Sequence, residues 1–435
     1  MKKKKVLVTG LFTQAGMFAV RRFARMGMSV TAADNHTLAF GMYSRYVSKK
    51  LLLPSLKNEP EAYAEAIIDE LKKGNYDYYF PSFEESYLMS HYKNSVKKYS
   101  STILSSPKKL LQLHDKKLLR NVVKKAGCNY PETYAPRNIQ EARSIASGIN
   151  FPVYIKMRQS CNSTGLRFVK NPENIMDAYN DVIERNSVPE KQLPLIQQLI
   201  QGREIVVNEL AQNGRVIGDT LYKGIRCIPR SGGTTTCRES LHHDSCVKEA
   251  DRFIKHISWT GFISMDFLID ENDGKIYIID CNPRPSVSIN MGFYGGVDMI
   301  PQWCAIADGE PAKKLPPIKP GIKSATGFAD FLWYLQTFIK GPESWSERKK
   351  MRKKWWEERK SIIDDMYAPD DKKPSLVLLV FLVFQAFKML FTKLEASSLY
   401  LYYNSFDMCC LYPERNRSEK IQSEKTGLQE SGVSE

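Results

Sequence analysis

The feature that most constrains the fold of this sequence is a predicted β-hairpin in the second half of the chain. Two apolar segments, 262–269 and 275–280, flank the turn signal Asn272-Asp273-Gly274. Such Asn/Asp/Gly clusters between apolar segments are typical of hairpin turns, because these residues tolerate the backbone angles that reverse the chain. The sequence therefore predicts two antiparallel strands here.

The two arms of this hairpin carry side chains with oxygen donors. Asp266 lies on the first arm, Asp280 lies on the second, and Asn282 follows two residues later and so points the same way. Opposed residues of antiparallel strands lie about 5 Å apart, so we expect both carboxylates on one face. Two carboxylates and an amide oxygen suit Mg²⁺ or Mn²⁺ bound together with phosphate oxygens. The alternative is a hairpin whose aspartates are solvated.

Arg284 follows this cluster by two residues. Its planar guanidinium matches phosphate geometry and would stand beside phosphates held by the hairpin, where negative charge develops in transfer.

A weaker signal lies at Lys156, at the end of a predicted strand over 153–157. A polar loop over 158–165 and a second predicted strand over 166–170 follow it. A lysine beside a Ser/Thr/Gly loop can cradle phosphates with backbone N–H groups. The alternative is a surface loop with an ordinary lysine.

A third signal is the segment 196–204, where a predicted strand enters a turn at Gly202 and reaches Glu204. Backbone at 198–200 can read the edge of an adenine, and Glu204 can accept hydrogen bonds from ribose hydroxyls. The alternative is two strands joined by a turn.

The N-terminal segment, residues 1–110, alternates predicted strands with predicted helices. The strands are expected at 6–10, 29–33 and 76–80, and the helices at 17–26 and 60–73. Such alternation indicates parallel βαβ units, whereas the block from residue 151 is predicted to be α+β with mostly antiparallel strands.

A dinucleotide site at the N-terminus is an alternative interpretation. Gly10, Gly16 and Asp34 partly match the fingerprint of NAD-binding folds, in which Asp34 would contact a ribose. The spacing does not match G-x-G-x-x-G, so the βαβ geometry alone explains the glycines more simply.

The net charge and the cysteine pattern limit which classes of protein the chain can belong to. The net charge is +15, of which Lys2–Lys5 contribute +4 and residues 348–360 contribute +6. Nucleic-acid binders usually spread basic residues over a folded face, so we expect no nucleic-acid partner. The nine cysteines show no paired spacing and the first residues show no secretory leader. We therefore expect a cytoplasmic protein with free thiols.

The C-terminal region, 325–412, is predicted to be helical, with an apolar helix over 375–392 and a disordered tail over 413–435. Between Lys373 and Lys388 lie 14 uncharged residues. At about 1.5 Å per residue they reach ~21 Å, less than the ~30 Å hydrocarbon core. A core helix or an interfacial helix is favoured, and a membrane span is the alternative.

The same region raises the question of membrane contact. The basic run 348–360 contains Trp355-Trp356, a composition typical of peripheral contact with an anionic membrane, here through 348–392. Acylation of Cys409-Cys410 is a further alternative.

Together the motifs resemble the ATP-grasp superfamily. The resemblance rests on His114-Asp115-Lys116, Lys156, the run 197–204, Asp266 and Asp280-Cys281-Asn282-Pro283-Arg284. The chain is similar in particular to carbamoyl-phosphate synthase-like ATP-grasp proteins. That likeness rests on Asp34 with Ser44-Arg45-Tyr46, on Pro81-Ser82-Phe83-Glu84-Glu85, and on the helical tail past residue 330.

The resemblance implies a definite domain organisation. A Rossmann-like α/β pre-ATP-grasp domain is expected over 1–112. An α+β ATP-grasp domain is expected over 113–310, with lobe A over about 113–195 and lobe B over about 196–310. The helical C-terminal appendage would follow.

The resemblance also implies a function, that of a ligase dependent on ATP and Mg²⁺. A small-molecule carboxylate would be activated as an acylphosphate and attacked by an amine. The implied roles are phosphate or adenine contact by Lys116 and Lys156, adenine contact by Gln198 and Ile200, ribose contact by Glu204, magnesium ligation by Asp266, Asp280 and Asn282, and transition-state stabilisation by Arg284.

Three departures from the family pattern keep another function open. Both acidic metal positions are Asp where the family often has Glu, the loop 159–165 has one glycine, and Gln198 stands where Glu is common. The alternative is a non-catalytic ATP-binding or membrane-associated scaffold.

The substrate end of the site is weakly marked. The segment 222–238 is predicted to be a polar loop in which Lys223, Arg230 and Arg238 hold a substrate carboxylate. The alternative is that these are solvated loop charges.

Overall fold

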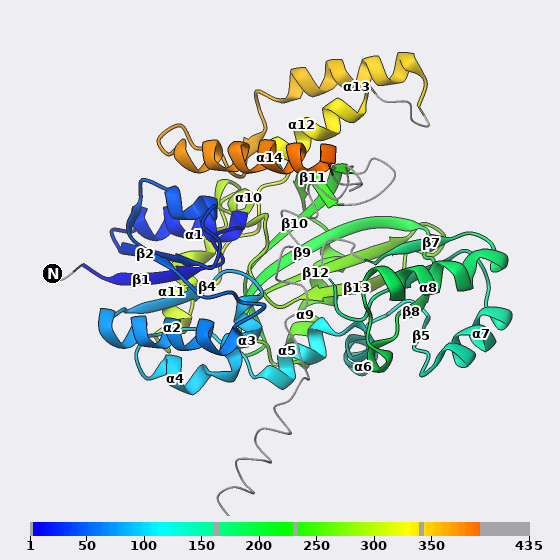
Figure 1. Ribbon diagram of the computed structural model, residues 1–435, viewed down its shortest axis with the longest axis horizontal. Helices are drawn as coiled ribbons and strands as arrows, with labels where there is room; N and C mark the ends of the chain where they lie inside the picture. Colours follow the sequence, from blue (N-terminus) through cyan, green and yellow to red (C-terminus); the bar gives the residue numbers. More distant parts are fainter. Residues whose placement is uncertain (1–2, 161–164, 229–233, 339–342, 392–435) are drawn as a thin grey trace, which may run out of the picture.

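The computed structural model describes residues 3–160, 165–228, 234–338 and 343–391, which form three sheets with flanking helices (Figure 1). The first sheet is entirely parallel, in the order β3-β2-β1-β4. Its strands are β1 (Lys5–Thr9), β2 (Ser29–Asp34), β3 (Val47–Leu52) and β4 (Tyr78–Pro81). The helices of this part are α1 (Gln14–Arg25), η1 (Phe40–Tyr43), α2 (Pro60–Gly74), α3 (Glu85–His91) and α4 (Lys93–Lys97).

Three of these strands and two of the helices lie where the sequence predicts them, whereas β3 was not predicted. Its residues, Val-Ser-Lys-Lys-Leu-Leu, are mostly exposed, because β3 lies at the edge of the sheet. An edge strand with exposed lysines carries no apolar alternation from which it can be recognised.

Asp34 has a structural role at the end of β2. Its carboxylate accepts hydrogen bonds from the backbone N–H of Leu11 at 2.7 Å and of His36 at 3.0 Å. Burial raises the pKa of Asp34 to about 7. The side chain that the dinucleotide interpretation would place on a ribose is thus bonded to the loop between β1 and α1.

The second sheet is the largest, with seven strands in the order β13-β12-β9-β10-β11-β14-β15. Its strands are β9 (Gly202–Gln212), β10 (Arg215–Ile228), β11 (Thr234–Leu241), β12 (Gly261–Asp270), β13 (Ile276–Asn282), β14 (Lys323–Ala325) and β15 (Ile363–Asp364). All pairs are antiparallel except β14 with β15. The nearby helices are α5 (Pro107–His114), α6 (Lys116–Lys125), α9 (Asp244–His256), α10 (Ile289–Tyr294) and α11 (Met299–Ala307).

The prediction of a polar loop over 222–238 is wrong. Residues up to Ile228 belong to β10 and residues from Thr234 to β11, and these strands pair with each other. Gly218 and Gly224 interrupt the apolar pattern of β10, and the pairing is irregular near Arg226. Arg230 lies outside the described residues.

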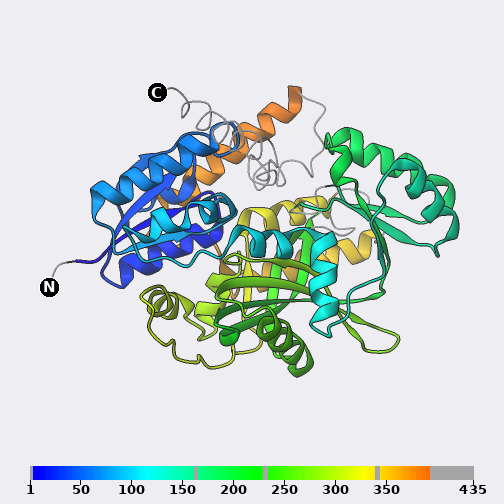
Figure 2. The same ribbon diagram turned by 90° about the horizontal axis from the view of Figure 1, so that it is seen from below.

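The third sheet forms a separate lobe, visible to one side in Figure 2. It has the order β5-β8-β6-β7 and is antiparallel. Its elements are β5 (Thr133–Tyr134), α7 (Ile139–Gly148), β6 (Val153–Lys156), β7 (Arg167–Val169), η2 (Pro172–Asn174), α8 (Ile175–Arg185), η3 (Glu190–Gln192) and β8 (Leu195–Gln198).

One apolar core joins the first sheet to the second. Phe80 of β4 packs on Trp303 of α11 with ring centroids 4.8 Å apart, and Phe262 of β12 lies in the same cluster. Burial of aromatic side chains of this size contributes about 2–3 kcal/mol each. The two sheets are therefore held against each other, and the site lies on the second sheet near this junction.

The C-terminal region contains helices α12 (Gly327–Gln336), α13 (Trp345–Glu358) and α14 (Lys373–Phe391). The sequence predicts only helices for this region, and that prediction is incomplete, because the strands β14 and β15 also lie here and extend the second sheet. Leu378 and Phe381 of α14 pack against Phe40 of the N-terminal part. No helix of the described residues is long and apolar enough to cross a membrane.

Cys409-Cys410 and the predicted tail over 413–435 lie outside the described residues.

Candidate active site

The predicted hairpin is present and brings its acidic residues together. Asp266 of β12 is the direct cross-strand partner of Asp280 of β13, and Ser264 is the partner of Asn282. The pairing is irregular between Asp266 and Phe267. All four of the paired side chains named here line one cavity of about 290 Å³.

Most of the residues selected from the sequence meet at this cavity. Those that line it are Lys116, Lys156, Glu204, Asp266, Asp280, Asn282 and Arg284. They come from α6, from the third sheet, from three strands of the second sheet and from the segment after β13. Gln198 and Ile200 are not among the residues that line the cavity, and Gln198 is exposed at the end of β8.

Lys116 is the first residue of α6 and is fixed by the helix cap. Asp115 accepts hydrogen bonds from the backbone N–H of Lys117 and Leu118, and Arg158 donates to the same carboxylate. The Lys116 N–H in turn donates to the Arg158 carbonyl at 2.9 Å. The Lys116 ammonium lies 3.2 Å from Oδ1 of Asp280. The cap thus holds one cation against the acidic hairpin.

Lys156 ends β6, and its side chain enters the cavity from the third sheet. Burial, together with the positive charge of Lys116, lowers the pKa of Lys156 to about 8, while the charges of Asp280, Asp266 and Glu204 oppose the shift. The residues of the polar loop after it, 161–164, lie outside the described residues.

Glu204 enters the cavity from β9, two residues after Gly202. A Cβ on Gly202 would lie 2.3 Å from the carbonyl oxygen of Ile269 on β12. Only glycine allows β9 and β12 to approach this closely here. This glycine thus sets the register that places Glu204 opposite Leu268 and Val206 opposite Asp266.

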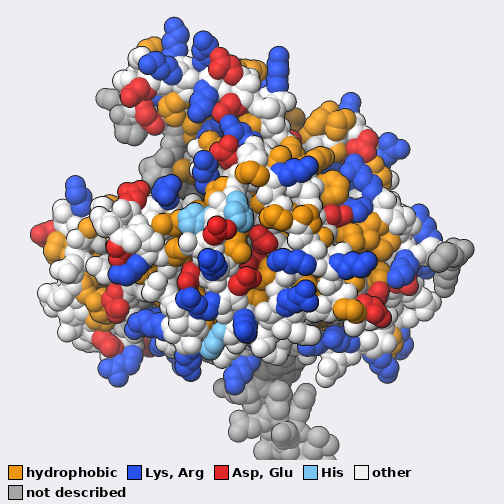
Figure 3. All heavy atoms as spheres, turned by 180° about the vertical axis from the view of Figure 1, so that it is seen from behind, with side chains coloured by type: hydrophobic (Ala, Val, Ile, Leu, Met, Phe, Trp, Pro, Cys, Tyr) orange, Lys and Arg blue, Asp and Glu red, His pale blue; other side chains and the backbone are white. Residues whose placement is uncertain are grey.

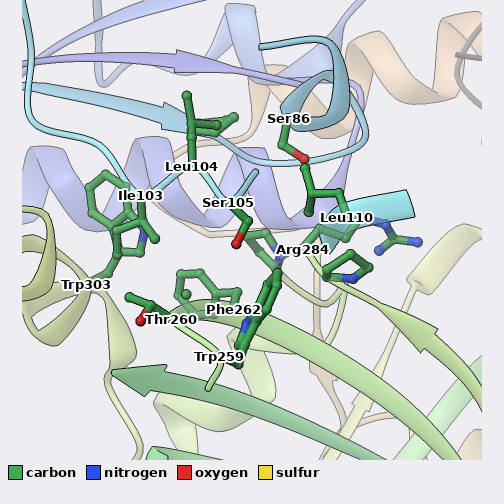
Figure 4. Close-up of a pocket in the computed structure, with 14 residues that line it drawn as sticks. Ser86, Ile103, Leu104, Ser105, Leu110, Trp259, Thr260, Phe262, Arg284 and Trp303 are labelled. Carbon is green, nitrogen blue, oxygen red and sulfur yellow. The ribbon is translucent and has the colours of Figure 1, made fainter. Parts of the chain in front are cut away.

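Arg284 is held by groups from the N-terminal part of the chain. Its guanidinium lies over the ring of Phe83 at 4.1 Å, and its Nε lies 3.8 Å from Oε1 of Glu84. Glu84 is 1% exposed, and burial raises its pKa to about 7 against the lowering effect of Arg284 and Lys116. Arg284 also lies at one side of a second cavity of about 40 Å³, whose walls include Trp259, Phe262 and Trp303 (Figure 4).

The residues predicted to bind a substrate carboxylate lie in different places in the structure. Arg238 of β11 lines the large cavity, with its guanidinium 5.6 Å from the ring of Tyr222 and its Nη1 3.1 Å from Asp365. Lys223 is exposed and pairs with Glu239 at 3.1 Å, and it is not among the residues that line the cavity.

Sequence reasoning missed Tyr222, which lies in a strand mistaken for a loop, and it missed the roles of Glu84 and Asp365. No local pattern marks Asp365, because it reaches Arg238 only through the pairing of β15 with β14.

The donor set fits a magnesium ion bound together with a phosphorylated ligand. Burial, with the charges of Glu204 and Asp280, raises the pKa of Asp266 well above its usual range. A divalent cation would relieve this crowding of carboxylates. Among the described residues no group of three His, Cys, Asp or Glu side chains is arranged to hold a metal. Two carboxylates and an amide suit Mg²⁺, which keeps waters and phosphate oxygens as further ligands.

Comparison with known proteins agrees with this geometry. Residues 113–288 match the sequence model of a family described as the ATP-grasp domain. This segment is an ATP-grasp domain. The matched segment contains the helix cap at Lys116, both strands of the hairpin and Arg284.

Curated relatives are similar at low identity. A carbamoyl-phosphate synthase of Methanobrevibacter smithii is 21% identical over 145 residues, which cover 32% of this chain and 37% of that protein. The carbamoyl phosphate synthase large chain of Caldanaerobacter subterraneus is 22% identical over 231 residues, 51% of this chain and 21% of that one. The matches thus span only about a fifth to two fifths of these relatives.

Solved structures share the fold. A biotin carboxylase of Campylobacter jejuni, in a β,γ-ATP complex, has a TM-score of 0.61 at 20% identity over 74% of both chains. An L-amino acid ligase of Bacillus licheniformis has a TM-score of 0.56 at 14% identity, over 74% of this chain and 79% of that one. At these identities the likeness shows the ATP-grasp fold alone.

Proposed function

We propose that this protein is a ligase that uses ATP and Mg²⁺ to activate a small-molecule carboxylate for attack by an amine or similar nucleophile. The observation that carries the proposal is the meeting of Lys116, Lys156, Glu204, the hairpin donors and Arg284 around one cavity. The ATP-grasp domain and its fold neighbours, which include a biotin carboxylase and an amino acid ligase, support the same class.

The reaction that we propose has two balanced steps. A carboxylate oxygen attacks the γ-phosphorus of ATP, and ADP leaves with the electron pair of the broken P–O bond. The nucleophile then attacks the acyl carbon of the acylphosphate, phosphate leaves, and the nucleophile loses one proton.

Each residue around the cavity has its own role in this proposed reaction. Lys116 and Lys156 contribute positive charge to the phosphates, and Glu204 accepts hydrogen bonds from the ribose. Asp266, Asp280 and Asn282 would hold the magnesium ion, which would supply positive charge to the phosphates when bound. Arg284 stands beside the hairpin, where its fork can donate to equatorial oxygens of the transferring group. Positioning and charge neutralisation of this kind are most of what phosphoryl transfer needs.

Arg238 is the residue that we assign to the carboxylate substrate. It is a buried cation on the wall of the cavity, and Asp365 fixes one side of its guanidinium. A bound carboxylate would approach from the cavity.

The test is Mg²⁺-dependent ADP release by the full chain, screened against pools of amino acids and other small acids labelled with ¹⁸O in the carboxylate. A ligase of this class transfers one ¹⁸O from the carboxylate to phosphate in the pool that stimulates ADP release. ADP release without label transfer would identify ATP hydrolysis instead. If the protein bound ATP but released no ADP with any pool, the alternative of a non-catalytic ATP-binding scaffold would be favoured.

A further inference from the structure

Exposed apolar side chains gather in the C-terminal region of the described chain. Of the twelve exposed large hydrophobic side chains among the residues whose burial the structure describes, nine lie between Phe331 and Val380. Single exposed apolar residues are ordinary, whereas a gathered set marks a surface that meets a partner. The nine are Phe331, Leu335, Phe338, Trp345, Trp356, Tyr367, Leu376, Leu379 and Val380.

Five of them form one continuous face on α12 and α13, which we call the α12–α13 face. Phe331, Leu335 and Phe338 recur at spacings of four and three residues and so lie on one side of α12 and its extension. Trp345 and Trp356 are eleven residues apart, about three turns, and share one side of α13. They are 59% and 52% exposed.

Contacts between the two helices join the two rows of side chains. The indole N–H of Trp356 donates to the hydroxyl of Tyr334 at 3.1 Å. The guanidinium of Arg352 lies 4.5 Å from the ring of Phe338 and 4.8 Å from that of Trp345. The rows are therefore one surface.

The same surface is strongly basic. Residues 345–360 hold eight Lys and Arg against three Glu, and Lys349, Lys350 and Lys353 are exposed. Figure 3 shows many blue side chains, with red and some orange ones among them, on the projecting end of the molecule that α12 and α13 form. Lys349 and Lys353 follow Trp345 by four and eight residues, so both border the tryptophan row.

We propose that the α12–α13 face binds the surface of an anionic lipid bilayer. Tryptophan and phenylalanine bordered by lysine are the composition of an interfacial helix, because indole rings settle at the headgroups while lysines meet anionic lipid. α14 carries a further set of exposed apolar side chains, Leu376, Leu379 and Val380.

Lipid suits this face better than nucleic acid. Arg352 and Arg359 already lie over the rings of Trp345, Trp355 and Trp356, at 4.8–5.4 Å, whereas base stacking needs an accessible ring face. Aliphatic side chains such as Leu335 gain nothing from bases but are buried favourably among acyl chains.

The experiment is sedimentation of the full chain with vesicles of phosphatidylcholine alone and with 30% phosphatidylserine. We expect binding to the anionic vesicles only, weakened by salt and accompanied by a blue shift of tryptophan emission. Trp345→Ala with Trp356→Ala, and separately Lys349→Glu with Lys353→Glu, should each weaken binding by on the order of tenfold or more.

Matched controls keep the test specific. Lys72→Glu with Lys125→Glu makes the same charge change at exposed positions elsewhere, and Phe168→Ala removes an exposed ring from the third-sheet lobe. Both should leave vesicle binding within about twofold, and circular dichroism should show every variant folded. No binding to anionic vesicles, equal loss in the controls, or binding to single-stranded RNA but not to vesicles would overturn the proposal.

Discussion

Arg238 and Asp365 form a buried ion pair in which Nη1 of the arginine lies 3.1 Å from Oδ2 of the aspartate, with side chains 1% and 0% exposed. Arg238 also donates to Thr326 at 3.4 Å, and Thr326 donates to Asp365. The C-terminal region therefore supplies the anion that positions a cavity arginine. It does so across β14 and β15, which extend the sheet of the site.

Asp365→Asn should lower the free energy of unfolding by about 3 kcal/mol, because it leaves Arg238 buried without its anion. The measurement is urea denaturation followed by circular dichroism. Asp370→Asn is the matched control, since its partner Arg25 and Asp370 itself are 39% and 44% exposed. Loss of a surface pair costs about 0–1 kcal/mol. Equal losses in both variants would show that the pair is not what stabilises this junction.

Asp280→Asn should lower Mg²⁺-dependent turnover by on the order of 10²-fold or more while the fold survives, because it removes one of two opposed carboxylates. ADP release measures the first effect and thermal unfolding the second. Asp273→Asn, at the turn of the same hairpin, should retain activity, since its exposed side chain pairs with Lys275 and does not line the cavity. If Asp280→Asn retained its turnover, the hairpin carboxylates would have no role in the reaction.

Glu84 should make stability depend on pH. Its pKa is raised by burial to about 7 from an ordinary value near 4.5, so the folded state holds its proton more tightly. The stability that this proton contributes is present below about pH 4.5 and is lost as pH rises to about 7. Glu84→Gln should remove this dependence in denaturation at pH 5 and pH 8.

In Arg284→Ala the pKa of Glu84 should rise further, because the guanidinium that lowers it is gone. The loss of folding stability with rising pH should therefore continue above pH 7. The substitution should also lower turnover by on the order of 10²-fold. The double variant with Glu84→Gln should regain stability but not activity, which separates the two roles of the arginine. Recovery of activity in the double variant would contradict a role for Arg284 in phosphoryl transfer.

ATP affinity should fall as pH rises through the pKa of Lys156, about 8. Below this value the side chain is charged, and one unit above it about a tenth of the molecules keep the charge, so affinity should weaken roughly tenfold. Calorimetric titration at pH 7 and pH 9 measures the change. Lys156→Arg stays charged throughout and should flatten the dependence. An unchanged slope in that variant would show that another group titrates.

The sequence predicts the parts of the site that local pattern determines. The hairpin follows from a turn signal between two apolar segments, and its register then places Asp266 opposite Asp280. Lys116 and Lys156 were identified through resemblance and spacing, and both line the cavity. Their roles, the domain boundaries and the substrates stay predictions.

The remaining features depend on contacts between distant segments. β10 has glycines that interrupt its alternation, and β14 and β15 have three and two residues, so neither shows a strand pattern. Glu84 meets Arg284 only because the first sheet packs on the second. Gln198 and Ile200 were placed from the resemblance, and neither is among the residues that line the cavity.

The most direct test of the central claim is calorimetric titration of the full chain with ATP, with and without Mg²⁺, for the native sequence, Asp266→Asn with Asp280→Asn, and Asp273→Asn. We predict Mg²⁺-dependent binding at one site that the double variant loses and Asp273→Asn keeps. Absence of ATP binding by the native chain, or binding that neither Mg²⁺ nor the double variant changes, would contradict the account.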